Sequence, residues 1–269
     1  MTAADDLDPR DREAVRTQLF RLADDELVVA ERYTEWQVRA PTLESDLSIS
    51  NIAQDEYGHA RLWYDLLQDF GDTEADLIWE RDPTAFKHAT FVERPFADGD
   101  WADAVLRNYL YDVAEQLRLE ALEDSTYTPL ADRVPTVQGE ESYHREHAQS
   151  WLERLAADDT GLDRVQTAVD SSFPAAMTLF DPVDTAIEAH ITDRGYRTRS
   201  LAALREDWLS ITVPFLESLE LTVPEPSRPD AVGRDGTHTA AWADLHAEMT
   251  NTYRELGRSA ATRIMEDPQ

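Results

Sequence analysis

Four long stretches of this sequence carry apolar residues at intervals of three and four, which is the spacing of amphipathic α-helices. Ala40 and Pro41 separate the first two stretches. The long segment 71–99, with at most a short helix near Thr73–Glu80, separates the second stretch from the third. Two hairpins of long helices joined by one long crossover are typical of the ferritin-like four-helix bundle. The four predicted helices cover about Asp11–Arg39, Thr42–Phe70, Asp100–Asp124 and Asp132–Ala157.

The rest of the chain also shows helical periodicity, which prolines interrupt. We expect Pro182, Pro214 and the proline-rich segment 223–230 to break the pattern. Proline ends helices because it lacks a backbone N–H and its ring clashes with the preceding turn. The additional C-terminal helices are predicted near residues 162–181, 199–220 and 238–265.

These patterns predict an all-α fold formed by a single domain, residues 1–269. Its core would be the four-helix bundle over about 11–157, and about 158–269 would form a C-terminal helical extension. No internal repeat is visible in the sequence, so an α-solenoid is not favoured. Nine glycines in 269 residues are also too few to favour a fold built on glycine-rich nucleotide loops.

The chain is strongly acidic, with 55 acidic residues against 25 basic ones and a net charge of −30. This charge would repel nucleic acids and anionic membranes, so we expect neither as a partner. Lys87 is the only lysine, and an acidic surface almost free of lysine is typical of adaptation to high salt. The absence of cysteine excludes disulfides, thiolate metal sites and iron–sulfur clusters carried by this chain. An acidic, polar start and the lack of any apolar run of roughly 18 residues predict a soluble, cytoplasmic protein.

Each predicted bundle helix carries a glutamate within its apolar stripe. An ionised carboxylate in such a stripe costs several kcal/mol unless it is paired or bound to a metal ion. One such residue would be ordinary, but one on each of four helices indicates a shared buried site. These residues are Glu26, Glu56, Glu115 and Glu141.

Two of these glutamates begin the motif Glu-x-x-His, which occurs at Glu56–His59 and at Glu141–His144. This spacing puts an oxygen ligand and a nitrogen ligand one turn apart on a single helix face. Glu26 and Glu115 mirror the two motifs across the turns of their hairpins, so each lies at the height of its partner motif. Four carboxylates with His59 and His144 at one level predict a carboxylate-bridged di-iron or di-manganese site.

Some positions of this ligand set have alternatives. Asp112 lies one turn before Glu115 and would serve in its place, and Glu140 competes with Glu141. On the first helix, Glu31 is a reserve for Glu26, although it points away from the apolar stripe. Without a metal ion, the same residues would form a buried glutamate–histidine hydrogen-bond network. Four further histidines form no cluster by spacing: His88, His190, His238 and His246.

Several segments resemble the C-subunit family of the bacterial phenylacetyl-CoA 1,2-epoxidase, the ring-oxygenating phenylacetate-CoA monooxygenase. They occur in the family's order over nearly the whole chain. The longest of them are Leu22–Val29, Gly58–Arg61, Phe91–Pro95, Trp151–Leu155, Thr178–Asp181 and Gly236–Thr239.

The resemblance implies a ferritin-like subunit that forms a heterodimer with a homologous catalytic A subunit. In that family the A subunit holds the di-iron centre and binds phenylacetyl-CoA, and the C subunit is usually described as structural. The complex is completed by a reductase with flavin and an iron–sulfur cluster, and by a small B subunit. The usual C subunit has lost much of the ligand set, whereas this sequence retains all six residues of the predicted site.

The sequence therefore supports three functional hypotheses. The first is the C subunit of a multicomponent phenylacetyl-CoA epoxidase that retains two iron ions, or two manganese ions, and acts with an aryl-CoA thioester. The second is a non-catalytic scaffold that stabilises the A subunit, and the third is a stand-alone di-iron oxidase or ferroxidase. A contact with CoA phosphates or with a partner subunit is predicted at the densest group of arginines: Arg194, Arg197, Arg199 and Arg205.

Overall fold

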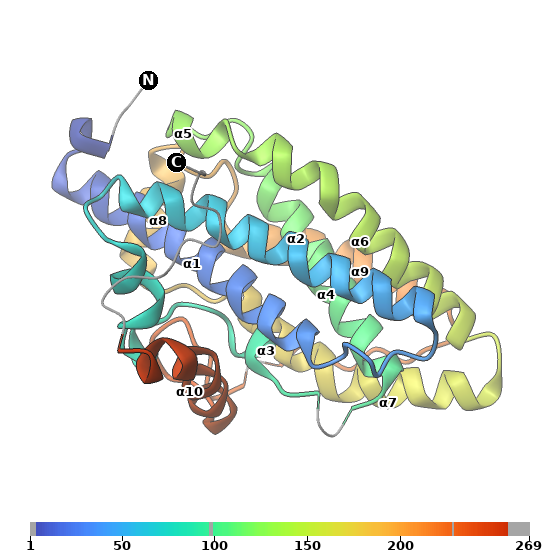
Figure 1. Cartoon of the computed structure of the whole chain (residues 1–269). Helices are drawn as coiled ribbons and strands as arrows, with labels where there is room; N and C mark the ends of the chain where they lie inside the picture. Colours follow the sequence, from blue (N-terminus) through green and yellow to red (C-terminus); the bar gives the residue numbers. More distant parts are fainter. Residues whose placement is uncertain (1–3, 97–98, 228, 258–269) are drawn as a thin grey trace.

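The computed structural model describes residues 4–96, 99–227 and 229–257, and within these ranges the chain is helical and contains no β-strand (Figure 1). The predicted all-α class is confirmed. In the same ranges, no helix is both long and apolar enough to cross a membrane.

Four long helices form the bundle and pair as two hairpins (Figure 1). α1 packs against α2, and α4 packs against α6. The chain between α2 and α4 crosses from one hairpin to the other, as in the ferritin-like arrangement. The bundle helices are α1 (Pro9–Thr34), α2 (Leu43–Gln68), α4 (Trp101–Glu120) and α6 (Val134–Leu155).

Polar side chains fix where three of these helices begin. Asp8 caps α1 by accepting two backbone N–H groups at 2.8 and 2.9 Å. Thr42 caps α2 and Asp100 caps α4 in the same way, which satisfies N–H groups that have no partner within the helix. α1 ends at Thr34, earlier than predicted, because the turn that follows leads to Val38 with φ 61°, a left-handed conformation that cannot continue the helix.

Short elements lie in the crossover and at the approaches to the long helices. The helix predicted near Thr73–Glu80 is present as a π-helical turn, η2, and α3 lies against α1. α3 thereby brings the end of the crossover under the first hairpin (Figure 1). The short elements are η1 (Ala4–Asp6), η2 (Ala75–Trp79), η3 (Pro83–Ala85), α3 (Thr90–Glu93) and α5 (Thr128–Ala131).

The C-terminal part wraps the bundle on one side. α7 and α9 pack against α4, and α8 packs against α1. α10 lies at the edge of the molecule, beside α3 and η3 (Figure 1). These elements are α7 (Asp159–Ala176), η4 (Met177–Phe180), α8 (Thr185–Asp193), α9 (Leu201–Ser218) and α10 (Ala240–Glu255).

The proline signals in this part were only partly reliable. The predicted break at Pro214 was wrong, since α9 continues through it. Thr212 and Leu216 on either side are fully buried, so their packing outweighs the one backbone hydrogen bond that proline removes. The short helix α8 was not predicted. Of the predicted helix near 238–265, residues 258–265 lie outside the described ranges.

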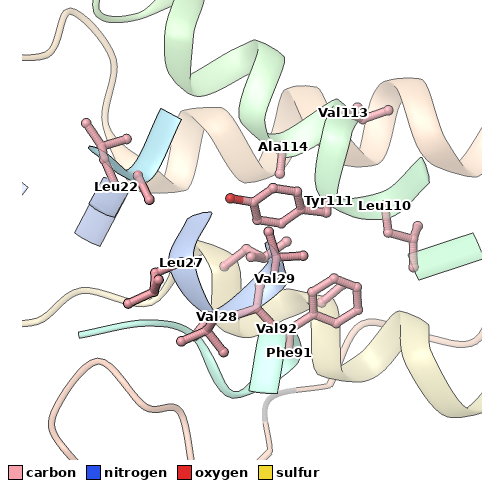
Figure 2. Packing of buried hydrophobic residues seen from close by; sticks show 14 of the residues in the cluster. Leu22, Leu27, Val28, Val29, Phe91, Val92, Leu110, Tyr111, Val113 and Ala114 are labelled. Atoms are coloured by element: carbon pink, nitrogen blue, oxygen red, sulfur yellow. The ribbon is translucent and has the colours of Figure 1, made fainter. Parts of the chain in front are cut away.

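α4 is the most enclosed helix, with buried residues on every side. Trp208 of α9 is fully buried and donates its Nε1–H to the Leu110 carbonyl of α4 at 2.9 Å. Polar groups on α4 are therefore shielded from water by apolar neighbours. Figure 2 shows the packing where α1, α3 and α4 meet, formed by Leu27, Val28, Val29, Phe91, Val92, Leu110, Tyr111, Val113 and Ala114.

Candidate metal centre

The two Glu-x-x-His motifs face each other across the bundle. Glu56 and His59 lie on α2, Glu141 and His144 lie on α6, and all four side chains are buried. The imidazole rings of His59 and His144 have their centroids 6.2 Å apart. The helical spacing thus brings the two motifs to one level, as the sequence predicts.

Each histidine is oriented by a carboxylate from the opposite helix. His59 Nε2 lies 2.7 Å from Glu140 Oε2, and His144 Nε2 lies 3.1 Å from Asp55 Oδ2. Because a carboxylate only accepts hydrogen bonds, each Nε2 carries a proton. The Nδ1 atoms are then left to face the centre of the bundle, which is the arrangement found for histidines that bind metal ions.

The Nδ1 atoms of the two histidines face the carboxylates of Glu56 and Glu141. His59 Nδ1 lies 3.3 Å from Glu141 Oε1 and 3.7 Å from Glu56 Oε2. His144 Nδ1 lies 3.5 Å from Glu56 Oε1 and 3.6 Å from Glu141 Oε1. Both carboxylates therefore lie between the two imidazoles, where they would be able to help hold metal ions.

Two further carboxylates complete two groups of potential ligands. Glu26 of α1 joins Glu56 and His59, and Asp112 of α4 joins Glu56, Glu141 and His144; within each group the ligand atoms lie within 4.8 Å of one another. Glu56 belongs to both groups. Two ligand groups that share one carboxylate are the arrangement expected for a dinuclear site.

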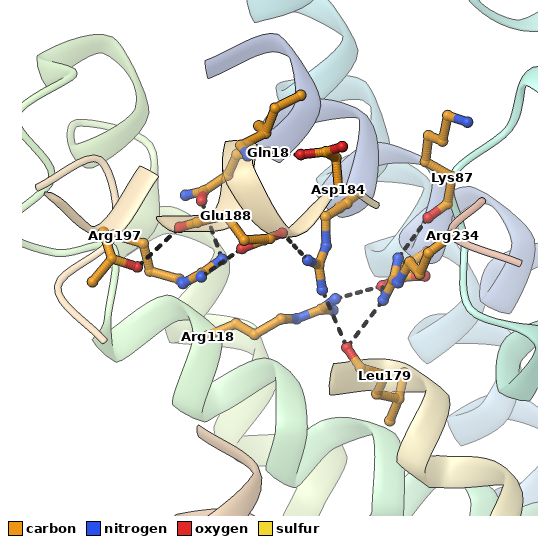
Figure 3. A network of polar contacts seen from close by, with 12 residues as sticks. Gln18, Lys87, Arg118, Leu179, Asp184, Glu188, Arg197 and Arg234 are labelled. Carbon is orange, nitrogen blue, oxygen red and sulfur yellow. Dashed lines mark hydrogen bonds and ion pairs between the residues drawn. The ribbon is translucent and has the colours of Figure 1, made fainter. Parts of the chain in front are cut away.

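Glu115, the residue predicted for α4, has a different partner. Its Oε2 pairs with the Arg118 guanidinium, which also pairs with Asp25. Arg234 forms a second ion pair with Asp25 at 2.7 Å, and Figure 3 shows Arg118 and Arg234 converging within this buried network. Glu115 is thus neutralised by arginine, and Asp112, the alternative one turn earlier, faces the cluster instead.

The carboxylate oxygens of this cluster are buried, and the described residues offer them no well-aligned hydrogen-bond donor. Within the described part of the chain, both carboxylate oxygens lack a well-aligned hydrogen bond in Glu26, Glu56, Asp112 and Glu141. His59 Nδ1 and His144 Nδ1 lack one as well. Fully ionised, these four carboxylates would carry four negative charges, and two divalent cations would supply four positive charges. The donor set and its charge therefore fit a pair of divalent metal ions.

The protonation equilibria of the cluster reflect this crowding. Burial and the neighbouring Glu56 carboxylate hold the pKa of Glu26 well above its ordinary value. Burial and the charge of Glu141 do the same to the pKa of Asp112. Burial alone would lower the pKa of His59, but its contacts with Glu141 and Glu56 raise that pKa to about 10. Without metal ions, the cluster retains protons at pH 7 that metal ions would displace.

The chain also matches known proteins over most of its length. A family model described as "Phenylacetic acid catabolic protein" matches residues 1–259. The chain belongs to this family. The C subunit of the 1,2-phenylacetyl-CoA epoxidase of Escherichia coli (strain K12) is 29% identical to it over 240 residues, which are 88% of this chain and 95% of that protein. The A subunit of the same epoxidase is 25% identical over 218 residues, 80% of this chain and 70% of that protein. The resemblance seen in the sequence is confirmed, and this family member is homologous to both subunits.

The structure also explains the alternatives that the sequence left open. Glu140, a rival of Glu141, is exposed and binds His59 from outside the cluster. Glu31, the reserve on α1, interacts with Tyr57 rather than with the cluster. The role of Asp55 and Glu140 was missed, although an acid directly before each Glu-x-x-His motif was a visible signal.

Tyr33 also lies near the cluster, and no role was predicted for it from the sequence. Its hydroxyl is buried and has no hydrogen-bond partner among the described residues. Burial, then the charges of Asp112 and Glu56, raise the pKa of Tyr33 well above 10. The phenol therefore remains protonated and is available as a hydrogen-bond donor close to the cluster.

The arginine group predicted to contact CoA or a partner is largely neutralised within the chain. Arg194 pairs with Asp11, Arg197 with Glu188, and Arg199 with Asp207. A cavity of about 450 Å³ beside α8 and α9 is lined by Arg197 and Arg205, with Met177, Phe180 and Leu201. It contains no residue of the metal cluster. A smaller cavity of about 190 Å³, between α4 and α6, is lined by Glu141 with Gln116, Ser142 and Arg145, so it adjoins the cluster.

Proposed function

We propose that this chain is the C-type subunit of a phenylacetyl-CoA epoxidase and that it carries its own dinuclear metal site. The proposed ligands are Glu26, Glu56, His59, Asp112, Glu141 and His144, with Glu56 and Glu141 between the two ions. Five of these six were predicted from the sequence, and Asp112 takes the place of Glu115.

The observation that carries this proposal is the shared Glu56 carboxylate between two ligand groups. A single metal ion would not require two imidazoles with their Nδ1 atoms turned toward the same pair of carboxylates. A purely structural network would satisfy its oxygens with donors, but these oxygens have no well-aligned donors within the described residues. Two divalent ions account for both features.

We infer that the metals are iron, with manganese as the alternative, since carboxylate and imidazole ligands suit both. Bound iron would supply the reduction of O₂. One oxygen atom of O₂ would go to an aromatic ring held as a CoA thioester, and the other would be reduced to water, which consumes two electrons and two protons. Since the chain has no cysteine, the electrons would come from a flavin and iron–sulfur reductase in the same complex.

In this proposal the protein holds the metal ligands in position and protects the site from water. Asp55 and Glu140 fix the imidazole orientations, and the buried walls of α4 exclude bulk water from the ligands. The cavity that reaches Glu141 between α4 and α6 offers a route for small molecules. The proposed partners in the complex are the homologous A subunit, the small B subunit, and the reductase.

Metal loading tests the proposal first. The chain is loaded anaerobically with Fe(II) at high salt, which screens weak binding to its acidic surface, and iron per chain is measured. We expect about two ions per chain in the wild type. Glu56→Ala combined with Glu141→Ala should remove them, whereas Glu44→Ala combined with Glu153→Ala, at exposed positions of α2 and α6, should retain them.

Turnover then separates catalysis from binding. The same variants are assembled with the A-type and B-type partners and a reductase, and oxygenation of phenylacetyl-CoA is followed. Loss of turnover only in the Glu56/Glu141 variant supports a catalytic site. Unchanged turnover in that variant assigns the chain a scaffold role, and rapid Fe(II) oxidation by the chain alone would point to a ferroxidase.

A further inference from the structure

A second cluster of potential metal ligands lies outside the bundle. His88 belongs to the crossover, Glu93 ends α3, and His238 precedes α10. His88 Nε2 lies 2.7 Å from Glu93 Oε2, and His238 Nδ1 lies 2.8 Å from the same oxygen. No sequence spacing predicts this cluster, because its members come from two segments about 145 residues apart.

Both ring nitrogens of His238 face hydrogen-bond acceptors. Its Nδ1 faces the Glu93 carboxylate, and its Nε2 lies 3.2 Å from the Phe86 carbonyl. Both neighbours are acceptors, so a neutral imidazole would leave one of these contacts without a proton. A cation on the Nδ1 side would let Nε2–H donate to the Phe86 carbonyl while Nδ1 binds the ion. Metal-binding histidines commonly donate their second N–H to a backbone carbonyl in this way.

We propose that His88, Glu93 and His238 bind one divalent transition-metal ion, zinc by preference. The ligand atoms would be His88 Nε2, Glu93 Oε2 and His238 Nδ1, which lie within 4.8 Å of one another. Two imidazole nitrogens and one carboxylate oxygen are a common zinc ligand set and leave a further position for water. At bond lengths of about 2.0–2.2 Å, ligands of one ion lie roughly 3 Å apart, so the side chains need only small movements.

The remaining contacts hold the ligands in place. Thr239 donates its backbone N–H to Glu93 Oε1 at 2.6 Å, which leaves Oε2 for the ion. The His88 and His238 rings stack with centroids 4.3 Å apart, and Trp242 packs against His88 at 4.4 Å.

This site shares no residue with the bundle cluster, and a metal ion bound there would have a different effect on the protein. His88 and Glu93 are fully buried, while the His238 side chain is 6% exposed beside exposed Thr239. An ion can therefore reach the cluster from the start of α10. Once bound, it would tie α10 to the crossover, at the edge of the molecule where α10 has few other neighbours (Figure 1). We expect a stabilising role for this ion.

The test uses the full chain carrying Glu56→Ala and Glu141→Ala, which should remove zinc binding at the bundle. Equilibrium dialysis against Zn²⁺ at high salt gives the metal content, and Co²⁺ absorption reports ligand geometry. His88→Asn and His238→Asn are the test variants. His190→Asn is the matched control, because His190 Nε2 also contacts a carboxylate at 2.7 Å, that of Asp11, but without a second imidazole.

We expect one Zn²⁺ per chain in the starting protein and in the His190 control. Each test variant should lose at least a hundredfold in zinc affinity and should lose the zinc-dependent rise in Tm. Equal zinc uptake in the test variants, or no uptake in the starting protein, would overturn the proposal. The three side chains would then form only a hydrogen-bonded cluster. If the starting protein does not fold, the same variants in the wild-type chain should lower the zinc stoichiometry by one ion, and an unchanged stoichiometry overturns the proposal.

Discussion

The carboxylates behind the two histidines give the sharpest prediction about the bundle site. Asp55 contacts His144 Nε2 and Glu140 contacts His59 Nε2, each from the opposite helix. Removing such a partner from a metal-binding histidine typically weakens metal binding about 10- to 100-fold, or roughly 1.4 to 2.8 kcal/mol. Asp55 and Glu140 lie on the outer side of the cluster, so neither variant removes a ligand.

The two variants should act on different ions. Asp55→Ala should weaken the ion held near Asp112 and His144, and Glu140→Ala should weaken the ion held near Glu26. Calorimetric titration with Fe(II) under anaerobic conditions, or with Mn(II), resolves two binding steps, and each variant should shift one of them. Asp55→Asn and Glu140→Gln keep an acceptor for the imidazole N–H, so we expect them to weaken metal binding by about tenfold rather than 100-fold.

Glu153→Gln is the control for these titrations, because Glu153 is an exposed carboxylate on α6. It should leave both binding steps unchanged. If Asp55→Ala and Glu140→Ala also leave both affinities unchanged while the helical content is retained, then Nδ1 of these histidines does not bind the metal. The two-site reasoning would then be refuted.

Three other predictions concern the surroundings of the site. Asp112→Asn should remove one metal ion per chain. Glu115→Gln should retain both ions and destabilise the fold by about 3–5 kcal/mol, because it breaks a buried ion pair. Metal analysis and denaturant unfolding separate these two effects. Metal binding at pH 7 should release at least two protons, because carboxylate contacts raise the pKa of His59 to about 10 and that of His144 also above its ordinary value. The metal affinity should therefore rise with pH, and titration in buffers of different ionisation enthalpy counts the released protons. Trp208→Phe should cost about 1–3 kcal/mol in unfolding free energy, because it removes a buried hydrogen bond to α4 and leaves a cavity beside it. Denaturant unfolding measures this cost, and an unchanged free energy would contradict the prediction.

Much of the site was predictable because helical periodicity is a local property. The 3.6-residue repeat decides which side chains share a face, so Glu56 and His59, or Glu141 and His144, could be placed together from spacing alone. The hairpin turns then set the height of Glu26. These inferences need no knowledge of how the hairpins pack.

The choice between Asp112 and Glu115 was not predictable in this way. Both residues lie on the buried side of α4, one turn apart, and the outcome depends on Arg118, whose partner Asp25 comes from α1. The second cluster was hidden for the same reason, since His238 reaches Glu93 only through the path of the C-terminal segment. Long-range ion pairs of this kind leave no periodic trace in the sequence.

Crystals of the chain loaded with Fe(II), measured at the iron absorption edge, test the central claim most directly. Two anomalous peaks are predicted inside the bundle, about 3.5–4 Å apart, one beside Glu26 and His59 and the other beside Asp112 and His144, with Glu56 between them. A bundle without an anomalous peak, in which these carboxylates and imidazoles hydrogen-bond only to one another, would contradict it.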